Sequence, residues 1–172
     1  IDPSYRIFYS NHDVLDIPAG ISSLCNLFEV LEPGSSSNFL KFIEEGKYKY
    51  RVGVQNLIYK PCLSLLELMD VELLKGVFRL HVFQSLSSYV RKFFKHPQLI
   101  QLLEFPAMFL GAAPQKTPAL YSLMNYADMA LGTWYPKGGM YKIVEAMVKL
   151  AESLDVNFRF NSAVQQIIVK GK

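Results

Sequence analysis

The sequence predicts an α+β protein that is mostly helical, with one small antiparallel sheet near its start and the beginning of an α/β unit near its end. Three observations predict this class. Two short strand-like stretches flank a polar turn within residues 5–18, and apolar residues then recur at helical spacing through the middle of the chain. A glycine pair at 138–139 precedes an amphipathic helix and another alternating stretch. We therefore predict two units, residues 1–135 and 136–172.

The first element is a predicted β-hairpin. Tyr5–Tyr9 and Val14–Pro18 are strand-like, and Ser10–Asp13 between them is rich in turn-forming residues. Proline cannot continue the hydrogen-bond ladder of a strand, so we expect the second strand to end at Pro18.

Two helices are predicted to follow the hairpin. Apolar residues recur at helical spacing from Gly20 to Leu31, and Pro33 with the glycine after it is typical of a helix end. Ser35–Asn38 offers side chains that cap helix N-termini, so a second helix should begin after it and end before Pro61.

Three further helices are predicted from the later apolar patterns. The first covers Ser85–Phe94, and the second covers Gln98–Leu110 after the helix breaker Pro97. Thr117 with the proline after it resembles a capped helix start, which places a third helix at Ala119–Ala127. Because the second of these is apolar on nearly every side, it should face a core, lipid or an apolar ligand.

The region around the glycine pair has its own pattern. Residues 130–135 read as a strand, and Gly138–Gly139 allows a tight crossing in which the backbone approaches a ligand or another element. Apolar residues within 143–154 then predict a helix, and Val156–Phe160 alternates like a strand. The glycine pair could equally serve close packing between a helix and a strand.

Composition limits the function. Of the 172 residues, 51% are hydrophobic and 13% aromatic, and the formal net charge is only +3. That charge is too small and too scattered to predict nucleic-acid binding. The apolar stretch at 105–114 is interrupted by prolines and far shorter than the ~20 residues that span a bilayer. Cys25 and Cys62 lie far apart in sequence, so a reducing cytoplasm is the default expectation.

Few residues suggest acid, base or metal chemistry. The three histidines are scattered singly, and no Gly-x-Ser-x-Gly motif of a hydrolase is present. We predict no metal site. The acidic cluster of Glu67, Asp70 and Glu72 is most simply a solvent-facing helix edge.

The segment Trp134–Met140, followed by a helix, a strand and Asn161–Val164, resembles the carotenoid (phytoene-type) desaturases of the flavin-dependent amine oxidase superfamily. The resemblance implies that residues 1–135 form a substrate-binding, membrane-associating domain. It further implies that the chain re-enters an FAD-binding α/β domain at residues 136–172, which would contribute a helix and strands to that domain.

The resemblance also assigns site residues. Glu67 takes the place of a carboxylate proposed to act beside the flavin, although Asp70 replaces the arginine that the family carries three residues later. Gly138, Gly139 and Met140 would lie by the isoalloxazine ring, and the backbone of Val164 would contact the adenine end of FAD.

No Gly-x-Gly-x-x-Gly motif of a dinucleotide-binding fold occurs in the chain. We therefore expect an internal segment of a longer enzyme, inactive by itself, whose main FAD motifs lie outside it. The expected whole enzyme desaturates a long apolar polyene such as phytoene and sits on the cytoplasmic membrane surface without spanning it. Two alternatives stay open. One is another oxidoreductase of the superfamily, acting on amines, porphyrinogens or retinoids, and the other is a non-catalytic module that binds apolar ligands or membranes.

Overall fold

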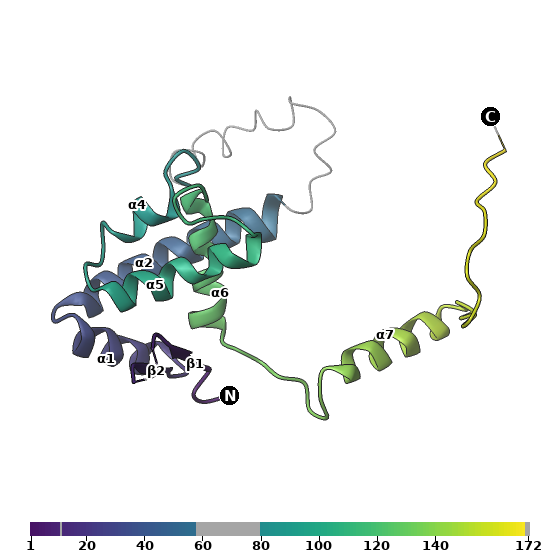
Figure 1. The fold of residues 1–172 in the computed structure, drawn as a ribbon, viewed down its shortest axis with the longest axis horizontal. Helices are drawn as coiled ribbons and strands as arrows, with labels where there is room; N and C mark the ends of the chain where they lie inside the picture. Colours follow the sequence, from purple (N-terminus) through teal and green to yellow (C-terminus); the bar gives the residue numbers. More distant parts are fainter. Residues whose placement is uncertain (11, 58–79, 171–172) are drawn as a thin grey trace. The chain divides into compact units, whose positions relative to one another are not determined.

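The computed structural model describes residues 1–10, 12–57 and 80–170, which are the coloured parts of Figure 1. These residues form two compact units, Ile1–Thr133 and Trp134–Lys172. The first contains helices and a two-stranded antiparallel sheet, so the predicted α+β class with a mostly helical first part is confirmed.

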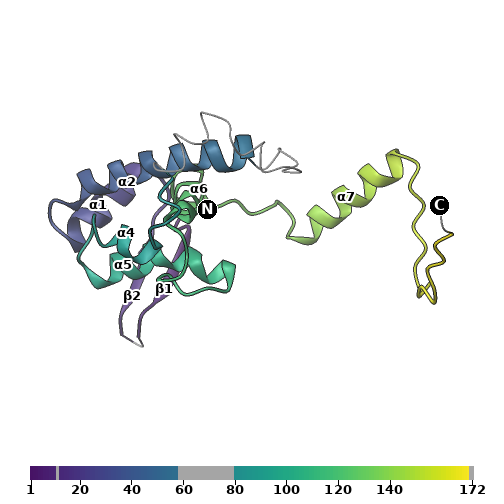
Figure 2. The ribbon, with the colours of Figure 1, turned by 90° about the horizontal axis from the view of Figure 1, so that it is seen from above.

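The predicted hairpin is confirmed. Strand β1 (Tyr5–Phe8) pairs antiparallel with strand β2 (Val14–Ile17). Arg6 and Asp16 face each other across the pair, and their side chains form two hydrogen bonds of 2.6 and 2.8 Å. On the other face Ile17 is buried in the core. The alternation in the sequence thus separates a solvent face from a core face. The hairpin projects from the helices in Figure 2.

Helix α1 (Ile21–Leu31) ends before Pro33 as predicted, but helix α2 (Ser35–Tyr50) begins earlier than expected. The serines of the predicted cap lie in its first turn, and Gly34 is the N-cap with a φ of 84°. Helix α2 begins early because a side chain of the preceding helix caps it in place of the serines. The carboxylate of Glu29 accepts hydrogen bonds from the backbone N–H groups of Gly34 (2.6 Å) and Ser36 (3.2 Å). Helix α2 continues as a π-helical segment, η1 (Arg51–Leu57).

Helix α4 (Leu86–Val90) is shorter than the helix predicted at 85–94. The Ser85 hydroxyl caps it by accepting a hydrogen bond from the Ser88 backbone N–H at 3.2 Å. The residues after α4 turn toward the end of α1. There the Glu32 carboxylate accepts hydrogen bonds from the backbone N–H groups of Lys95 and His96 at 2.9 and 2.8 Å. These long-range bonds fix the connection to the next helix.

Helix α5 (Pro97–Glu104) begins at the predicted breaker, because proline is well accommodated in the first turn of a helix. It ends before the predicted Leu110, and Phe105–Leu110 instead forms the 3-10 helix η3. Pro106 has no N–H to continue the α-helical hydrogen bonds, which explains the early end.

The 3-10 helix η4 (Ala119–Ser122) leads into helix α6 (Leu123–Leu131). The predicted helix at 119–127 is therefore present in two parts, and Pro118 rather than Thr117 stands at the cap position. The predicted strand at 130–135 is wrong. Helix α6 extends to Leu131 and ends at Gly132 with a φ of 88°, and the residues after it pair with no described strand.

Aromatic rings dominate the core of the first unit. Helix α2 packs against α1 and α6, and α4 packs against α5 (Figure 1). The ring centroids of Phe28 and Phe39 lie 4.2 Å apart, and those of Phe28 and Phe94 lie 5.3 Å apart. Gly46 allows the close approach of α2 to α6, because an added Cβ would lie 3.1 Å from the Cβ of Tyr126.

The second unit contains helix α7 (Tyr141–Ser153), which confirms the predicted amphipathic helix. None of the residues of α7 is buried. Val156–Phe160 does not form the predicted strand, because a strand requires a hydrogen-bonded neighbour and the described residues of this unit provide none. Within the described ranges, no helix is long and apolar enough to cross a membrane.

Candidate functional site

A pocket of about 650 Å³ lies in the first unit between strand β1, the α5–η3 segment and helix α6. Its walls are largely apolar. Ile7 and Phe8 come from the strand, Phe105 and Phe109 come from η3, and Met124 comes from α6. The rings of Phe105 and Phe109 meet edge to face, with centroids 5.4 Å apart. The pocket has the volume and lining of a site for an apolar small molecule.

A second pocket of about 430 Å³ adjoins the first. The two share Ile7, Phe8, Leu102 and Phe105 in their walls. The arrangement arises because helix α5 ends earlier than the predicted helix at 98–110. Because η3 turns away from the α-helical course after Glu104, its aromatic side chains stay partly exposed, with Phe105 42% and Phe109 72% accessible. The residues predicted to form an all-round apolar helix instead line two adjoining hollows.

The first pocket has a polar end formed around Asp128, and Ser4 and Arg6 also line the pocket. The Tyr5 hydroxyl donates to Asp128 Oδ2 at 2.8 Å, and the Thr133 hydroxyl donates to Oδ1 at 3.1 Å. Burial, together with the charge of Asp128 and this hydrogen bond, raises the pKa of Tyr5. The phenol therefore stays protonated and keeps donating. Nearby, Asn125 is buried and donates from Nδ2 to the Leu103 carbonyl at 3.1 Å, which fixes α6 to α5.

The described lining of this pocket offers few side chains for acid and base catalysis. Its lining holds no histidine, cysteine or lysine. Asp128 is half-buried and its oxygens already accept two hydrogen bonds. The described residues contain no group of three or more metal-ligating side chains. A reaction in this pocket would therefore need a reactive group from elsewhere, such as a cofactor.

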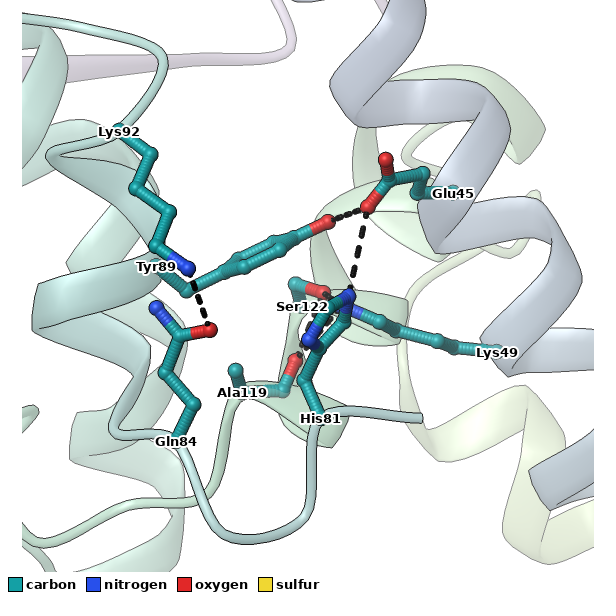
Figure 3. Close-up of polar contacts among 8 residues, drawn as sticks. All are labelled: Glu45, Lys49, His81, Gln84, Tyr89, Lys92, Ala119 and Ser122. Carbon is teal, nitrogen blue, oxygen red and sulfur yellow. Dashed lines mark hydrogen bonds and ion pairs between the residues drawn. The ribbon is translucent and has the colours of Figure 1, made fainter. Parts of the chain in front are cut away.

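A separate charged network lies buried between α2, α4 and η4 (Figure 3). Lys49 is fully buried and donates from Nζ to the Ala119 carbonyl at 3.1 Å and the Ser122 hydroxyl at 2.9 Å. Its Nζ also lies 3.6 Å from the ring centroid of Tyr89. The Tyr89 hydroxyl in turn donates to the carboxylate of Glu45. These contacts connect three elements through one buried cation.

Burial sets the protonation of this network. It lowers the pKa of Lys49 to about 7, although the Glu45 carboxylate opposes the shift. Burial and the hydrogen bond to Glu45 raise the pKa of Tyr89. His81, whose Nε2 lies 3.9 Å from Glu45, has a lowered pKa because of burial and the charge of Lys49. None of these residues lines the two pockets, so the network supports the fold rather than the ligand site.

The structure brings only some of the predicted site residues together. Glu67, predicted as catalytic, lies outside the described residues, as do Asp70 and Glu72. Gly138 and Gly139 form a tight turn with φ values of 90° and 97°, and Met140 follows as the N-cap of α7. The role of each of these residues stays a prediction.

The turn at 138–139 has one side open to a ligand. A Cβ added at Gly139 would meet only the Tyr135 hydroxyl, at 3.9 Å, whereas one added at Gly138 would lie 3.2 Å from the Lys142 side chain. Val164 is 78% exposed and lies in a segment without regular structure. The backbone beside Gly139 is therefore accessible, and Val164 is exposed, while the cofactor contacts predicted for both stay predictions.

No local pattern in the sequence indicates the polar end of the pocket. Tyr5 and Asp128 are 123 positions apart, and each is unremarkable in its own segment. Only the packing of the hairpin against α6 brings them together. A search for polar residues on the apolar faces of β1 and α6 would have found both.

The chain matches the model of the family described as flavin-containing amine oxidoreductase over residues 2–171. It is 30% identical to a carotenoid 3,4-desaturase of Haloarcula japonica over 97% of the chain and 34% of that protein. It is 28% identical to a zeta-carotene-forming phytoene desaturase of Myxococcus xanthus, over 99% of the chain and 33% of the relative. A phytoene desaturase of Neurospora crassa is 30% identical over 98% of the chain and 29% of its own length.

The chain thus spans about a third of the length of these relatives. The match extends over both compact units and includes the hairpin, the pocket and the glycine turn. The resemblance seen in the sequence is confirmed at the level of the family. The chain belongs to the flavin-containing amine oxidoreductase family.

Proposed function

We propose that this chain is part of an FAD-dependent desaturase that introduces double bonds into a linear carotenoid precursor such as phytoene. The observation that carries the proposal is the apolar pocket with its adjoining hollow, whose walls suit a long hydrocarbon. The names of the relatives, which are carotenoid and phytoene desaturases, support the same substrate class. Residues 1–135 would bind the polyene, and residues 136–172 would return to the FAD-binding domain.

The glycine turn would contribute to cofactor binding. Its positive φ values and the open space beside Gly139 suit a backbone that lies against the isoalloxazine ring, with Met140 next to it. Val164 would contact the adenine end of FAD once that part of the domain is assembled. Bound FAD would supply the hydride acceptor for the reaction. The residues of this chain would orient the polyene and exclude water from it.

The test uses the whole protein that contains this chain, loaded with FAD. Under anaerobic conditions, phytoene in detergent micelles should bleach the oxidised flavin absorbance near 450 nm, because a hydride leaves the substrate. An amine such as benzylamine should leave the absorbance unchanged. Bleaching by the amine and not by phytoene would contradict the proposal.

Amine oxidation is the second candidate function, and one observation favours it. Asp128 places a carboxylate at the end of the pocket, where it could pair with a substrate ammonium group. The same anaerobic experiment separates the two candidates. If neither compound bleaches bound flavin, the non-catalytic module becomes the better account.

We also propose that the protein attaches to the cytoplasmic face of a membrane, where its substrate would dissolve. On η3, Met108 and Phe109 are 69% and 72% exposed. Arg91, Lys92 and Lys95 after α4 are exposed as well and add positive charge. Apolar contact and attraction to anionic lipids together give firm attachment, whereas either alone is weak.

Cosedimentation with anionic vesicles tests this attachment. Replacing Met108 and Phe109 with serine should release most of the protein, and high salt should weaken the binding of the wild type. The matched control replaces Met147 with serine on α7, where the side chain is 66% exposed. Equal binding of all three proteins at low and high salt would contradict the proposal.

A further inference from the structure

The polar end of the main pocket has an unusual composition for a site that takes only hydrocarbon. Asp128 lies in an otherwise largely apolar wall, and Tyr5 and Thr133 both donate hydrogen bonds to it. A hydrocarbon chain makes no use of a carboxylate, and bringing an apolar group beside one removes water from the charge. The arrangement therefore suits a ligand that offers a polar group at this end.

The direction of the hydrogen bonds defines that polar group. Each oxygen of Asp128 accepts one hydrogen bond, from Tyr5 or from Thr133. A carboxylate has about four acceptor positions, so capacity for a further donor remains. The neighbouring Asn125 amide donates to the Leu103 carbonyl rather than to Asp128. The ligand group that completes the site must donate a hydrogen bond.

Among donors, a hydroxyl suits this end better than an ammonium group. Two hydroxyl donors from the protein already offset part of the negative charge of Asp128. Transferring an ammonium group from water into an apolar pocket costs far more than transferring a neutral hydroxyl. A second carboxylate would be repelled. The complementary ligand is long and apolar, with a hydroxyl at one end.

We propose that Asp128, held by Tyr5 and Thr133, is a specificity determinant that makes polyenes with a terminal hydroxyl group bind more tightly than unsubstituted ones such as phytoene, which the pocket would still accept. This inference rests on the proposed function, because it takes the ligand of the pocket to be a polyene. The hydroxyl would donate to Asp128, and the chain of the polyene would lie against Ile7 and Phe105. The group acts in binding and takes no part in bond breaking.

The experiment measures binding of three fluorescent probes to the whole protein that contains this chain: all-trans-retinol, its methyl ether and retinylamine. The methyl ether keeps the polyene and the oxygen but cannot donate a hydrogen bond. Retinol should bind about tenfold more tightly than the ether, which is the scale of a hydrogen bond to a charged group. In Asp128→Asn the preference should fall to about twofold or less. The control Asp155→Asn, at an exposed position whose φ of 61° asparagine tolerates, should keep it.

The outcomes separate this inference from the proposed function. If retinol and its ether bind wild type equally well, the inference is wrong while polyene binding stands. Tightest binding of retinylamine, lost in Asp128→Asn, would also overturn it in favour of an amine ligand. If no probe binds, the inference falls and so does the proposed polyene pocket. The wild-type comparison of retinol with its ether needs no variant, so it remains decisive even if Asp128→Asn fails to fold.

Discussion

Within its observed bounds α5 is amphipathic like α7, because the all-round apolar stretch predicted at 98–110 continues into η3, but the two helices have opposite surroundings. In α5, Leu99 and Leu103 are fully buried against neighbouring helices. In α7, Met147 and Leu150 lie on the apolar face and are 66% and 62% exposed. The spacing of apolar residues predicts a helix in both cases, because it defines one face. Whether that face is buried depends on partners from other segments, and these are present for α5 within its own unit.

The same contrast extends to function. The first unit has an aromatic core and a pocket whose walls come from three elements. The second unit offers a backbone turn and an apolar helix face, beside which lies an open hollow lined by Ile143 and Met147. Under the proposed function, ligand recognition by side chains would belong to the first unit, whereas the second would contribute chiefly through its backbone.

The largest expected effect comes from making the same substitution in both helices. Leu103→Ala should lower the free energy of unfolding of the first unit by about 2–5 kcal/mol, because it leaves a cavity in the core. Leu150→Ala should change it by less than about 0.5 kcal/mol, because that side chain is already exposed. Urea unfolding followed by circular dichroism measures both. Similar losses in the two variants would show that α7 is also packed.

A second prediction compares a buried cation with an exposed one. Lys49 has a pKa of about 7 in the folded chain, against 10.5 for an exposed lysine. Between these values the unfolded chain binds a proton that the folded chain lacks. The free energy of unfolding should therefore rise with pH, by up to about 1.4 kcal/mol per pH unit. Urea unfolding from pH 7 to 8 measures this rise, because the ordinary pKa values of cysteine, about 8.5, and of tyrosine, about 10, lie above this range.

Two lysine variants provide the control for this pH dependence. Lys49→Met should flatten the rise, because the titrating group is gone. Lys142→Met should leave it unchanged, since the exposed pair that Lys142 forms with Glu145 at 2.6 Å depends little on folding. The same slope in Lys49→Met as in the wild type would mean that Lys49 is not its source.

A smaller effect is expected from adding a methyl group to one glycine of each unit. Gly46→Ala would place a Cβ 3.1 Å from Tyr126 Cβ and 3.3 Å from the Ser122 carbonyl oxygen. Such overpacking should lower the free energy of unfolding by about 1–3 kcal/mol, and the higher helix propensity of alanine should restore up to about 1 kcal/mol of this loss. Gly139→Ala has space around it and strains only its local turn, so the unfolding midpoint of the first unit should not move. A stable Gly46→Ala variant would argue against the close contact between α2 and α6.

The sequence predicted those elements whose structure is decided locally. Strand-like stretches around a polar turn sufficed for the hairpin, and apolar spacing sufficed for α1 and α7. The two predicted strands at 130–135 and 156–160 failed, because a strand depends on a neighbour that its own sequence does not specify. The predicted start of α2 was wrong for a related reason, since the cap of this helix comes from Glu29 in the preceding helix.

The candidate site was harder to predict than the fold. The glycine turn could be found from two adjacent residues, and its positive φ values follow from the same property that made it recognisable. The pocket could not be found in this way, because it depends on the end of α5 at Pro106 and on the contact between Tyr5 and Asp128. Neither the hollow nor its polar end is encoded in any one segment.

Product analysis of the whole protein that contains this chain tests the central claim most directly. The protein is incubated with FAD and phytoene in anionic vesicles, and the extracted polyenes are separated by chromatography with absorbance detection. The account predicts that phytoene is consumed and that products with longer conjugated systems, absorbing at longer wavelengths, appear in its place. Unchanged phytoene in the presence of fully bound, reducible flavin would contradict the claim that this chain belongs to a carotenoid desaturase.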